Sequence, residues 1–187
     1  MAVELARRRF TVDEYYRMAE VGILSHQERV ELVDGEIVEM SPIGSWHAAC
    51  VAILNRLFSR LLGDRAVLWV QNPVRLGPRS EPEPDVCLLR PPLDSYRKAH
   101  PVPEDVLLLI EVADTTLQYD RSVKVPMYAR AGIREVWIID LAGDAVLIYR
   151  TPSPEGYLRE GRVGRGGSFA PEAFPDATLA VDDILGH

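Results

Sequence analysis

The feature that most restricts the fold of this chain is a run of apolar residues at positions 106–112, interrupted only by Glu111. A short apolar run that is bounded by polar residues predicts a β-strand buried on both faces of its sheet. A carboxylate inside such a strand is costly unless it is paired or binds a cation. The run therefore predicts a sheet that is covered on both sides and that contains one compensated charge.

Two local motifs predict the structure that precedes this strand. Thr11 and Glu14 have the spacing of a capping box, which predicts a helix over residues 11–20. The pair Asp34-Gly35 is favoured in tight turns, and the apolar residues around it predict a β-hairpin over residues 29–40. We therefore expect an N-terminal helix followed by a hairpin.

The rest of the chain alternates between helical and strand patterns. Apolar residues spaced three and four apart predict a long helix that Ser45 can cap and Gly63 ends, with Trp46 on its apolar side. The other predicted elements are strands at 67–76, 86–89, 135–140, 145–150 and 157–163, a helix at 120–131 and a helical turn at 181–185. Together they predict an α/β fold in which a mixed β-sheet is flanked by α-helices.

Length and composition favour a single domain over residues 1–187. Its predicted core lies at about 28–150, with the helix at 11–20 and the strands of 157–185 as appendages. An apolar fraction of 47% is enough to bury a sizeable interior. The net charge of −7 argues against a protein that coats polyanions, but it allows a local basic patch that binds nucleic acid.

The chain carries no pattern of a membrane or secreted protein. No stretch approaches the roughly 18 apolar residues that a membrane helix needs, and the arginines at 7–9 are not followed by the apolar run of a secretory signal. We therefore expect a cytoplasmic protein with no membrane partner. Cys50 and Cys87 fall in a predicted helix and a predicted strand, so both are expected to be buried thiols rather than disulfide partners.

Three charged residues stand out because of their places in the predicted sheet. Asp85 lies at the start of the strand at 86–89, directly before its first residue. Glu111 lies near the end of the most apolar strand, and Lys124 lies on the helix that follows that strand. Carboxylates on neighbouring strand ends can hold Mg²⁺ or Mn²⁺, and a lysine beside them can orient a water or balance charge in a transition state. The alternative is a structural ion pair between Glu111 and Lys124, and these residues alone leave both interpretations open.

Longer stretches around these residues resemble one known family. They are Pro-Asp-Val at 84–86, Glu-Val-Ala-Asp-Thr-Thr at 111–116, Tyr-Asp-Arg-Ser-Val-Lys at 119–124, Tyr-Ala-Arg-Ala-Gly-Ile at 128–133, Glu-Val-Trp-Ile-Ile-Asp at 135–140 and Glu-Leu-Val-Asp-Gly-Glu at 31–36. In this pattern, which covers about Phe10 to Tyr149 and includes His47, the chain resembles the Uma-type family of bacterial restriction endonucleases.

The resemblance implies a restriction endonuclease-like fold of the PD-(D/E)xK nuclease superfamily, with Mg²⁺ or Mn²⁺ held by Asp85 and Glu111. The superfamily usually carries a lysine two residues after the second acid, where this chain has Ala113. Lys124 is the candidate replacement, because only the position of the ammonium group in space matters to the chemistry. Asp85, Glu111 and Lys124 are therefore the predicted catalytic residues.

Three further residues are candidates for the same site. Glu31 is either a third metal ligand or an exposed acid of the hairpin, and His47 either contacts a phosphate or has a purely local partner. Tyr128 lies four residues after Lys124 and shares its helix face, so it is a second candidate for substrate contact, or it steadies the lysine, or it simply packs. Asp120 is predicted to cap that helix.

The sequence thus predicts a metal-dependent nuclease that acts on nucleic acid, on DNA in preference to RNA, and as a homodimer if both strands of a duplex are cut. A catalytically silent domain that works through binding is the main alternative, and a hydrolase of small phosphorylated molecules is a third. Basic residues around the Asp85 strand are expected to steer a phosphate backbone or to be ordinary solvated charges. They are Arg75, Arg79, Arg90, Arg97 and Lys98.

Overall fold

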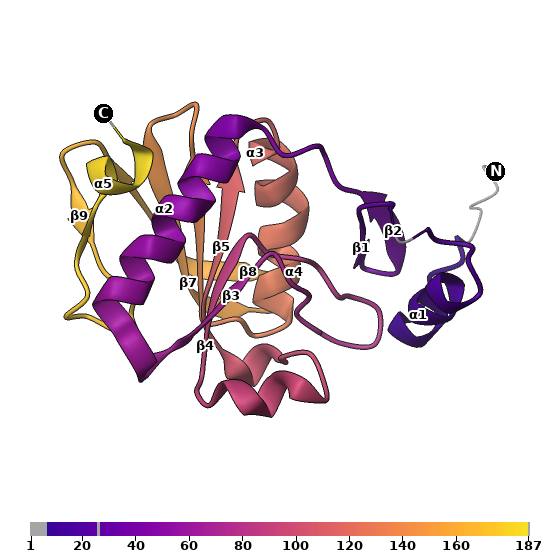
Figure 1. Cartoon of the computed structure of the whole chain (residues 1–187). Helices are drawn as coiled ribbons and strands as arrows, with labels where there is room; N and C mark the ends of the chain where they lie inside the picture. The colour runs from indigo at the N-terminus through magenta and orange to yellow at the C-terminus, as the bar shows by residue number, and fades with distance from the viewer. Residues whose placement is uncertain (1–6, 26, 187) are drawn as a thin grey trace.

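A six-stranded mixed sheet forms the centre of the computed structural model, which describes residues 7–25 and 27–186 (Figure 1). The strand order is β3-β4-β5-β6-β7-β8, and only β5 and β6 are parallel. The strands are β3 (Val67–Val70), β4 (Val86–Leu89), β5 (Val106–Ala113), β6 (Glu135–Asp140), β7 (Ala145–Ser153) and β8 (Gly156–Gly164). This is the mixed sheet that the sequence predicts.

The parallel pair requires a crossover, and this crossover is the helical segment that carries Lys124. It consists of α3 (Leu117–Tyr119), the π-helical turn η4 (Asp120–Lys124) and α4 (Val125–Arg130). The segment begins at Leu117, earlier than the predicted helix at 120–131. Asp120 lies inside it with helical φ and ψ of −59° and −45°, so the prediction that Asp120 caps the helix is wrong.

Helices cover both faces of the sheet, with α2 (Ser45–Leu62) on one face and α4 on the other (Figure 1). Leu108 and Ile110 of β5 pack into the layer below α2, whereas Leu109 packs into the layer below α4. This alternation buries the strand on both faces, as its apolar run predicts. The short α5 (Val181–Leu185) joins the layer below α2.

The N-terminal helix and hairpin lie beside the sheet at the indigo end of the chain (Figure 1). In α1 (Val12–Glu20) the predicted capping box is present. The hairpin consists of β1 (Val30–Val33) and β2 (Glu36–Glu39), and Asp34 and Gly35 have positive φ of 47° and 78° at its turn. A backbone hydrogen bond of 2.8 Å from Glu81 N to Leu32 O ties the hairpin to the segment before β4.

Several details differ from the sequence patterns. Trp46 is 46% exposed although it shares the helical spacing of the buried residues, and Gly44 rather than Ser45 is the N-cap of α2. The strand predicted over 67–76 ends at Val70. Strand β8 pairs with β7 and belongs to the six-stranded sheet, so this sheet continues beyond position 150.

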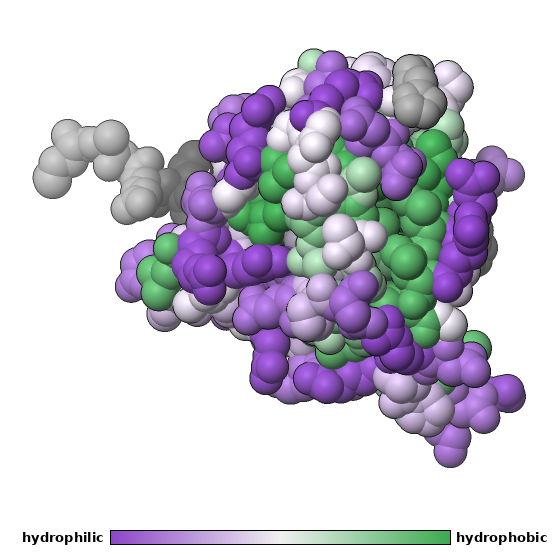
Figure 2. Space-filling view, turned by 90° about the vertical axis from the view of Figure 1, so that its left-hand side faces the viewer, coloured by the Kyte–Doolittle hydropathy of each residue, from purple (hydrophilic) through white to green (hydrophobic). Residues whose placement is uncertain are grey.

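The remaining elements are short. The 3₁₀ turns are η1 (Gly63–Arg65), η2 (Leu93–Arg97) and η3 (Pro103–Asp105), and a two-residue ladder joins β9 (Ser168–Phe169) to β10 (Leu179–Ala180). Hydrophilic residues border the side of the molecule that carries α5 and β9, and hydrophobic residues show between them (Figure 2). Over the described residues, no helix has both the length and the apolar character to cross a membrane.

Candidate active site

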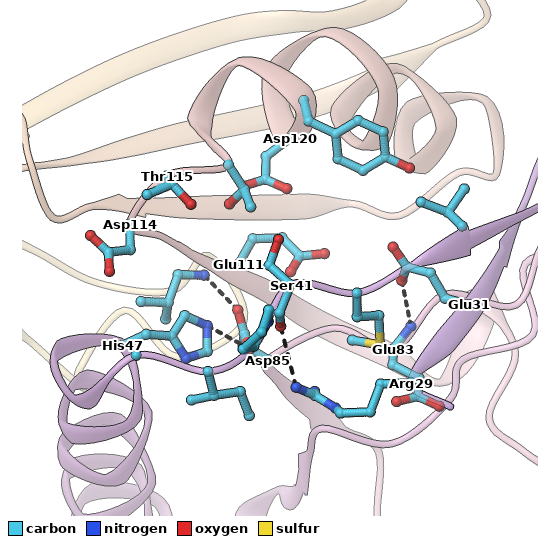
Figure 3. A pocket seen from close by; sticks show the side chains of 18 of the residues that line it. Arg29, Glu31, Ser41, His47, Glu83, Asp85, Glu111, Asp114, Thr115 and Asp120 are labelled. Carbon is cyan, nitrogen blue, oxygen red and sulfur yellow. Dashed lines mark hydrogen bonds and ion pairs between the residues drawn. The ribbon is translucent and has the colours of Figure 1, made fainter. Parts of the chain in front are cut away.

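A pocket of about 350 Å³ lies where the hairpin, the first turn of α2, the end of β5 and the crossover helix meet (Figure 3). Seven carboxylates line it, against the two permanent cations of Arg29 and Lys124. The carboxylates are those of Glu31, Glu39, Glu83, Asp85, Glu111, Asp114 and Asp120. Such an excess of hard, negatively charged oxygen atoms is the environment that a divalent cation such as Mg²⁺ prefers.

Asp85 and Glu111 occupy facing positions on neighbouring strands. Val86 pairs with Ile110 in the antiparallel ladder of β4 and β5, so the register places Asp85 opposite Glu111. Residues that are opposite in an antiparallel pair project to the same face, and both side chains line the pocket. Asp85 Oδ2 also accepts a hydrogen bond of 2.8 Å from the backbone N–H of Val112.

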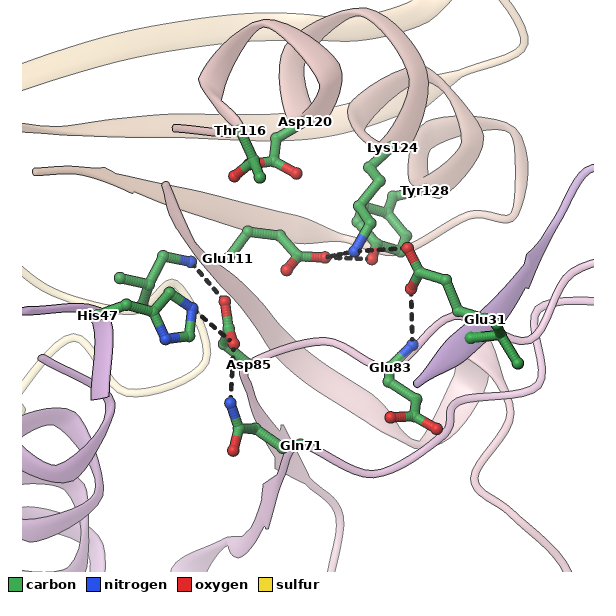
Figure 4. Close-up of polar contacts among 12 residues, drawn as sticks. Glu31, His47, Gln71, Glu83, Asp85, Glu111, Thr116, Asp120, Lys124 and Tyr128 are labelled. Carbon is green, nitrogen blue, oxygen red and sulfur yellow. Dashed lines mark hydrogen bonds and ion pairs between the residues drawn. The ribbon is translucent and has the colours of Figure 1, made fainter. Parts of the chain in front are cut away.

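Glu111 is 4% exposed and is compensated by two donors from the crossover helix (Figure 4). Lys124 Nζ lies 3.2 Å from Glu111 Oε1, and the Tyr128 hydroxyl donates to the same oxygen. Burial raises the pKa of Glu111 to about 8, because the opposing effect of Lys124 is smaller and Asp85 adds repulsion. Both bonds go to Oε1, so neither of these donors occupies Oε2.

Lys124 bridges two carboxylates that come from distant parts of the chain. Its Nζ lies 3.1 Å from Glu31 Oε1 as well as 3.2 Å from Glu111 Oε1. Burial alone would lower the pKa of Lys124, but Glu111, Glu31 and Asp120 together raise it, so the side chain is charged. The π-helical turn ends at Lys124, and π-helical turns of this kind recur at functional sites.

Glu31 is buried on β1 and has both carboxylate oxygens engaged. Oε1 pairs with Lys124, and Oε2 accepts a hydrogen bond of 3.1 Å from the backbone N–H of Glu83. The alternative that Glu31 is an exposed acid of the hairpin is therefore wrong. The structure brings Glu31 to the same pocket as Asp85 and Glu111, where its contact with Lys124 helps to hold the lysine in place.

His47, in the first turn of α2, reaches Asp85 across the end of the sheet (Figure 4). Its Nε2 lies 3.0 Å from Asp85 Oδ1, which also accepts a 3.3 Å bond from Gln71 Nε2. The hydrogen bond to Asp85 raises the pKa of His47, and burial opposes the rise. The interpretation that His47 has only a local partner is wrong, and its buried Nδ1 has no hydrogen-bond partner among the described residues.

Two further residues of the site, Asp120 and Gln71, are not among the residues that the sequence predicts for it. Asp120 is 3% exposed, lines the pocket and accepts a 2.7 Å hydrogen bond from the Thr116 hydroxyl. Burial raises its pKa. Its spacing of four residues before Lys124 could have revealed that both side chains share one helix face. Gln71 follows β3 with a positive φ of 49°, and no sequence motif marks it.

The residues present fit a hard divalent cation only in part. No three His, Cys, Asp or Glu side chains within residues 7–25 and 27–186 are grouped closely enough to form a complete metal-ligand set. Mg²⁺ is commonly bound through one or two carboxylates, with waters and substrate phosphates completing its shell. Asp85 and Glu111 supply such a pair, and Glu111 Oε2 is free of the bonds that Lys124 and Tyr128 make.

Five basic residues are expected to steer a phosphate backbone or to be solvated surface charges, and none of them lines this pocket. They are Arg75, Arg79, Arg90, Arg97 and Lys98. Among the residues that line the pocket, the basic side chains are Arg29, Lys124 and, when protonated, His47. Arg75 instead pairs with Glu81, and Arg97 pairs with Asp94. None of the five therefore contributes a wall of this pocket, and whether they steer a phosphate backbone stays a prediction.

Comparison with known proteins agrees with the fold. A crystal structure titled as a "putative nuclease belonging to DUF820" from Anabaena variabilis ATCC 29413 superposes with a TM-score of 0.72 at 16% identity, over 94% of this chain and 97% of that one. A comparison with curated protein sequences finds no match. The model of the Uma2 family, described as "Putative restriction endonuclease", matches residues 12–182. The chain therefore belongs to the Uma2 family.

Proposed function

We propose that this protein is a metal-dependent nuclease that hydrolyses phosphodiester bonds in nucleic acid, with DNA as the preferred substrate. One observation carries the proposal: Asp85 and Glu111 face each other across two strands, and Lys124 Nζ lies 3.2 Å from Glu111 in the same acidic pocket. Membership of a family described as restriction endonucleases gives independent support.

Asp85 and Glu111 are the residues that would hold Mg²⁺ or Mn²⁺. When bound, such an ion polarises a phosphoryl oxygen and lowers the pKa of a coordinated water. Glu31 is the candidate for a third ligand, but its contacts with Lys124 and with Glu83 N favour a role in holding the lysine. Hydrogen bonds from Gln71 and Val112 fix the Asp85 carboxylate, which is the kind of support that ligating carboxylates usually have.

Lys124 is proposed to stabilise the negative charge that develops on the phosphoryl group. Its ammonium group is held by carboxylates on both sides, so it is oriented before substrate arrives. His47 borders the pocket and can donate to a phosphate oxygen when it is protonated. Tyr128 is fully buried and bonds to Glu111, so we propose that it positions that carboxylate instead of contacting substrate.

A second candidate is a catalytically silent domain that acts through binding. The observation in its favour is that Lys124 is already neutralised by Glu31 and Glu111, as in a structural ion-pair cluster. In that case removal of either partner would lower stability and change nothing else.

An enzyme that cuts both strands of a duplex would act as a homodimer, which sedimentation would detect.

The test is cleavage of single- and double-stranded DNA and RNA with Mg²⁺ or Mn²⁺, with EDTA as the blank. Glu111→Gln should abolish cleavage. Glu135→Gln is the matched control, because Glu135 is 1% exposed and paired with Arg150 on the sheet but does not line the pocket. If wild-type protein cuts none of these substrates at high enzyme concentration, the nuclease proposal fails and the binding domain replaces it.

A further inference from the structure

A second cavity, of about 650 Å³, lies between α1, the edge strand β3 and the loop that contains η2. It combines several aromatic rings with basic side chains. Its aromatic residues are Tyr16, Trp69, Tyr96 and His100, and its basic residues are Arg75, Arg97 and Lys98. Cavities of about 300–1,000 Å³ are the usual size of ligand sites.

The rings form two pairs that border the cavity. Trp69 and Tyr96 have centroids 5.9 Å apart at an interplanar angle of 55°, and Tyr16 and His100 are stacked with centroids 6.4 Å apart at 20°. All four side chains are only partly buried. Partly exposed rings of this kind are the surfaces on which nucleobases stack, because every base has a π-face.

The charges of the cavity are separated. Arg97 is 77% exposed at the side-chain level and pairs only weakly, through an exposed contact with Asp94, while Lys98 is its exposed neighbour. On the opposite wall, α1 contributes the carboxylates of Asp13 and Glu20. One side of the cavity thus suits a phosphate, and the other offers acceptors for the amino groups of a base edge.

The two cavities share one segment of chain, the stretch 81–85 that leads into β4. Glu81 accepts hydrogen bonds from the Tyr16 hydroxyl and from Arg75 of the second cavity, with Arg75 Nε at 2.6 Å. Two residues later, Glu83 lines the acidic pocket, as Asp85 does. Two residues that line the second cavity are therefore bonded to the chain segment whose next residues line the acidic pocket.

We propose that the second cavity binds a nucleotide unit, with its base against the Trp69–Tyr96 pair and its phosphate at Arg97 and Lys98. This rests on the proposed function in so far as the unit belongs to a nucleic-acid strand. A free nucleotide has the same chemistry, and the two sources are distinguished by the experiment. In either case the site takes a base and a phosphate together, at a distance from the hydrolytic carboxylates.

The test measures binding to the full chain in EDTA, so that cleavage plays no part. The probes are a fluorescein-labelled eight-residue oligothymidylate, followed by anisotropy, and adenosine monophosphate, followed by calorimetry. Arg97→Gln/Lys98→Gln should weaken oligonucleotide binding about tenfold and reduce the dependence on salt, since phosphate contacts are lost. The matched control is Arg56→Gln/Arg60→Gln, which removes the same charge from exposed positions of α2 that line neither cavity.

A second readout locates the base. Ligand should quench the tryptophan fluorescence of the wild type, and Trp69→Phe should bind with similar affinity but lose the quenching. Binding of the oligonucleotide alone identifies a strand site, and equal binding of the mononucleotide identifies a free-nucleotide site. The proposal is overturned if neither probe binds, if Arg97→Gln/Lys98→Gln binds as tightly as wild type, or if quenching persists in Trp69→Phe. Binding in EDTA without cleavage in Mn²⁺ would contradict the proposed nuclease activity and leave this site intact.

Discussion

The carboxylate of Asp85 accepts a hydrogen bond of 2.8 Å from the backbone N–H of Val112, the residue that follows Glu111. The bond links the two strands that carry the proposed metal ligands. Asp85 directly precedes β4, and the bond holds its carboxylate against β5. Glu111 of β5 lines the same pocket. The backbone of β5 therefore helps to orient the Asp85 carboxylate at the pocket that Glu111 also lines.

Asp85→Asn should keep the fold and lose metal binding. The amide oxygen can accept on one side only, because the NH₂ group donates, so part of the bonding from His47, Gln71 and Val112 is lost. The amide also carries no charge, and the loss of an outer-shell partner alone lowers metal affinity about 10–100-fold. We expect a larger loss when a ligand charge is removed. Calorimetric titration with Mn²⁺ measures the effect, with Asp140→Asn as the control, since Asp140 is a buried acid that does not line the pocket. Undiminished affinity in Asp85→Asn would contradict the assignment.

Lys124→Ala should separate stability from chemistry. The change leaves Glu31 and Glu111 buried without their shared cation, which costs on the order of 3–5 kcal/mol of the free energy of unfolding. Mn²⁺ should restore part of this loss by binding the carboxylate of Glu111 that has lost its partner, whereas turnover should fall on the order of 10²–10³-fold. Thermal melts with and without Mn²⁺, run beside cleavage assays, test both effects. Equal cleavage by the variant and wild type would remove Lys124 from the mechanism.

Tyr128→Phe tests whether the tyrosine positions Glu111. The substitution removes the hydroxyl that donates to Glu111 Oε1 and keeps the ring, which packs in the core between α4 and the sheet. Metal affinity should fall about 10–100-fold, as for other outer-shell partners. Tyr157→Phe is the control, because it removes a buried hydroxyl that bonds only to the backbone carbonyl of Ile133 at 2.6 Å. The positioning role is refuted if the two variants bind Mn²⁺ equally well.

The contribution of His47 to stability should depend on pH. Asp85 raises the pKa of His47 above its unfolded value of about 6.5, so folding favours the protonated form. This stabilisation is fully present below pH 6.5 and is lost as the pH rises through the higher pKa of the folded state. The difference in Tm between wild type and His47→Gln, measured without metal, should therefore shrink between pH 6 and pH 8. A difference that stays constant over this range would contradict the ion pair.

The apolar periodicities predict the layers of the fold well, because they report burial. The strands at 86–89 and 135–140 coincide with β4 and β6, and the fold class is confirmed by the observed sheet and by the superposition on a known structure. Patterns fail where exposure is decided by the rest of the chain. Trp46 has helical spacing, yet no element covers it, and it is 46% exposed.

The site could be predicted only as far as local sequence reaches. Glu111 and Lys124 stand out because an acid in an apolar strand requires a partner. Gln71 and Asp120 do not stand out, since their roles depend on pairings with Asp85 and with the pocket that form only in three dimensions. The two cavities also could not be foreseen, because α1 and the loop after β4 must fold back before the second one exists.

Glu31 reaches Lys124 from the hairpin, which lies far earlier in the chain than the crossover helix. Contacts between such distant residues require the closure of a long loop and tend to form late in folding. The crossover between β5 and β6 can bring Glu111 and Lys124 together on its own, but Lys124 gains its second carboxylate partner, Glu31, only when the hairpin docks. Docking of the hairpin therefore completes the cluster, so the candidate site is fully assembled only in a chain whose N-terminal hairpin has packed against the crossover helix.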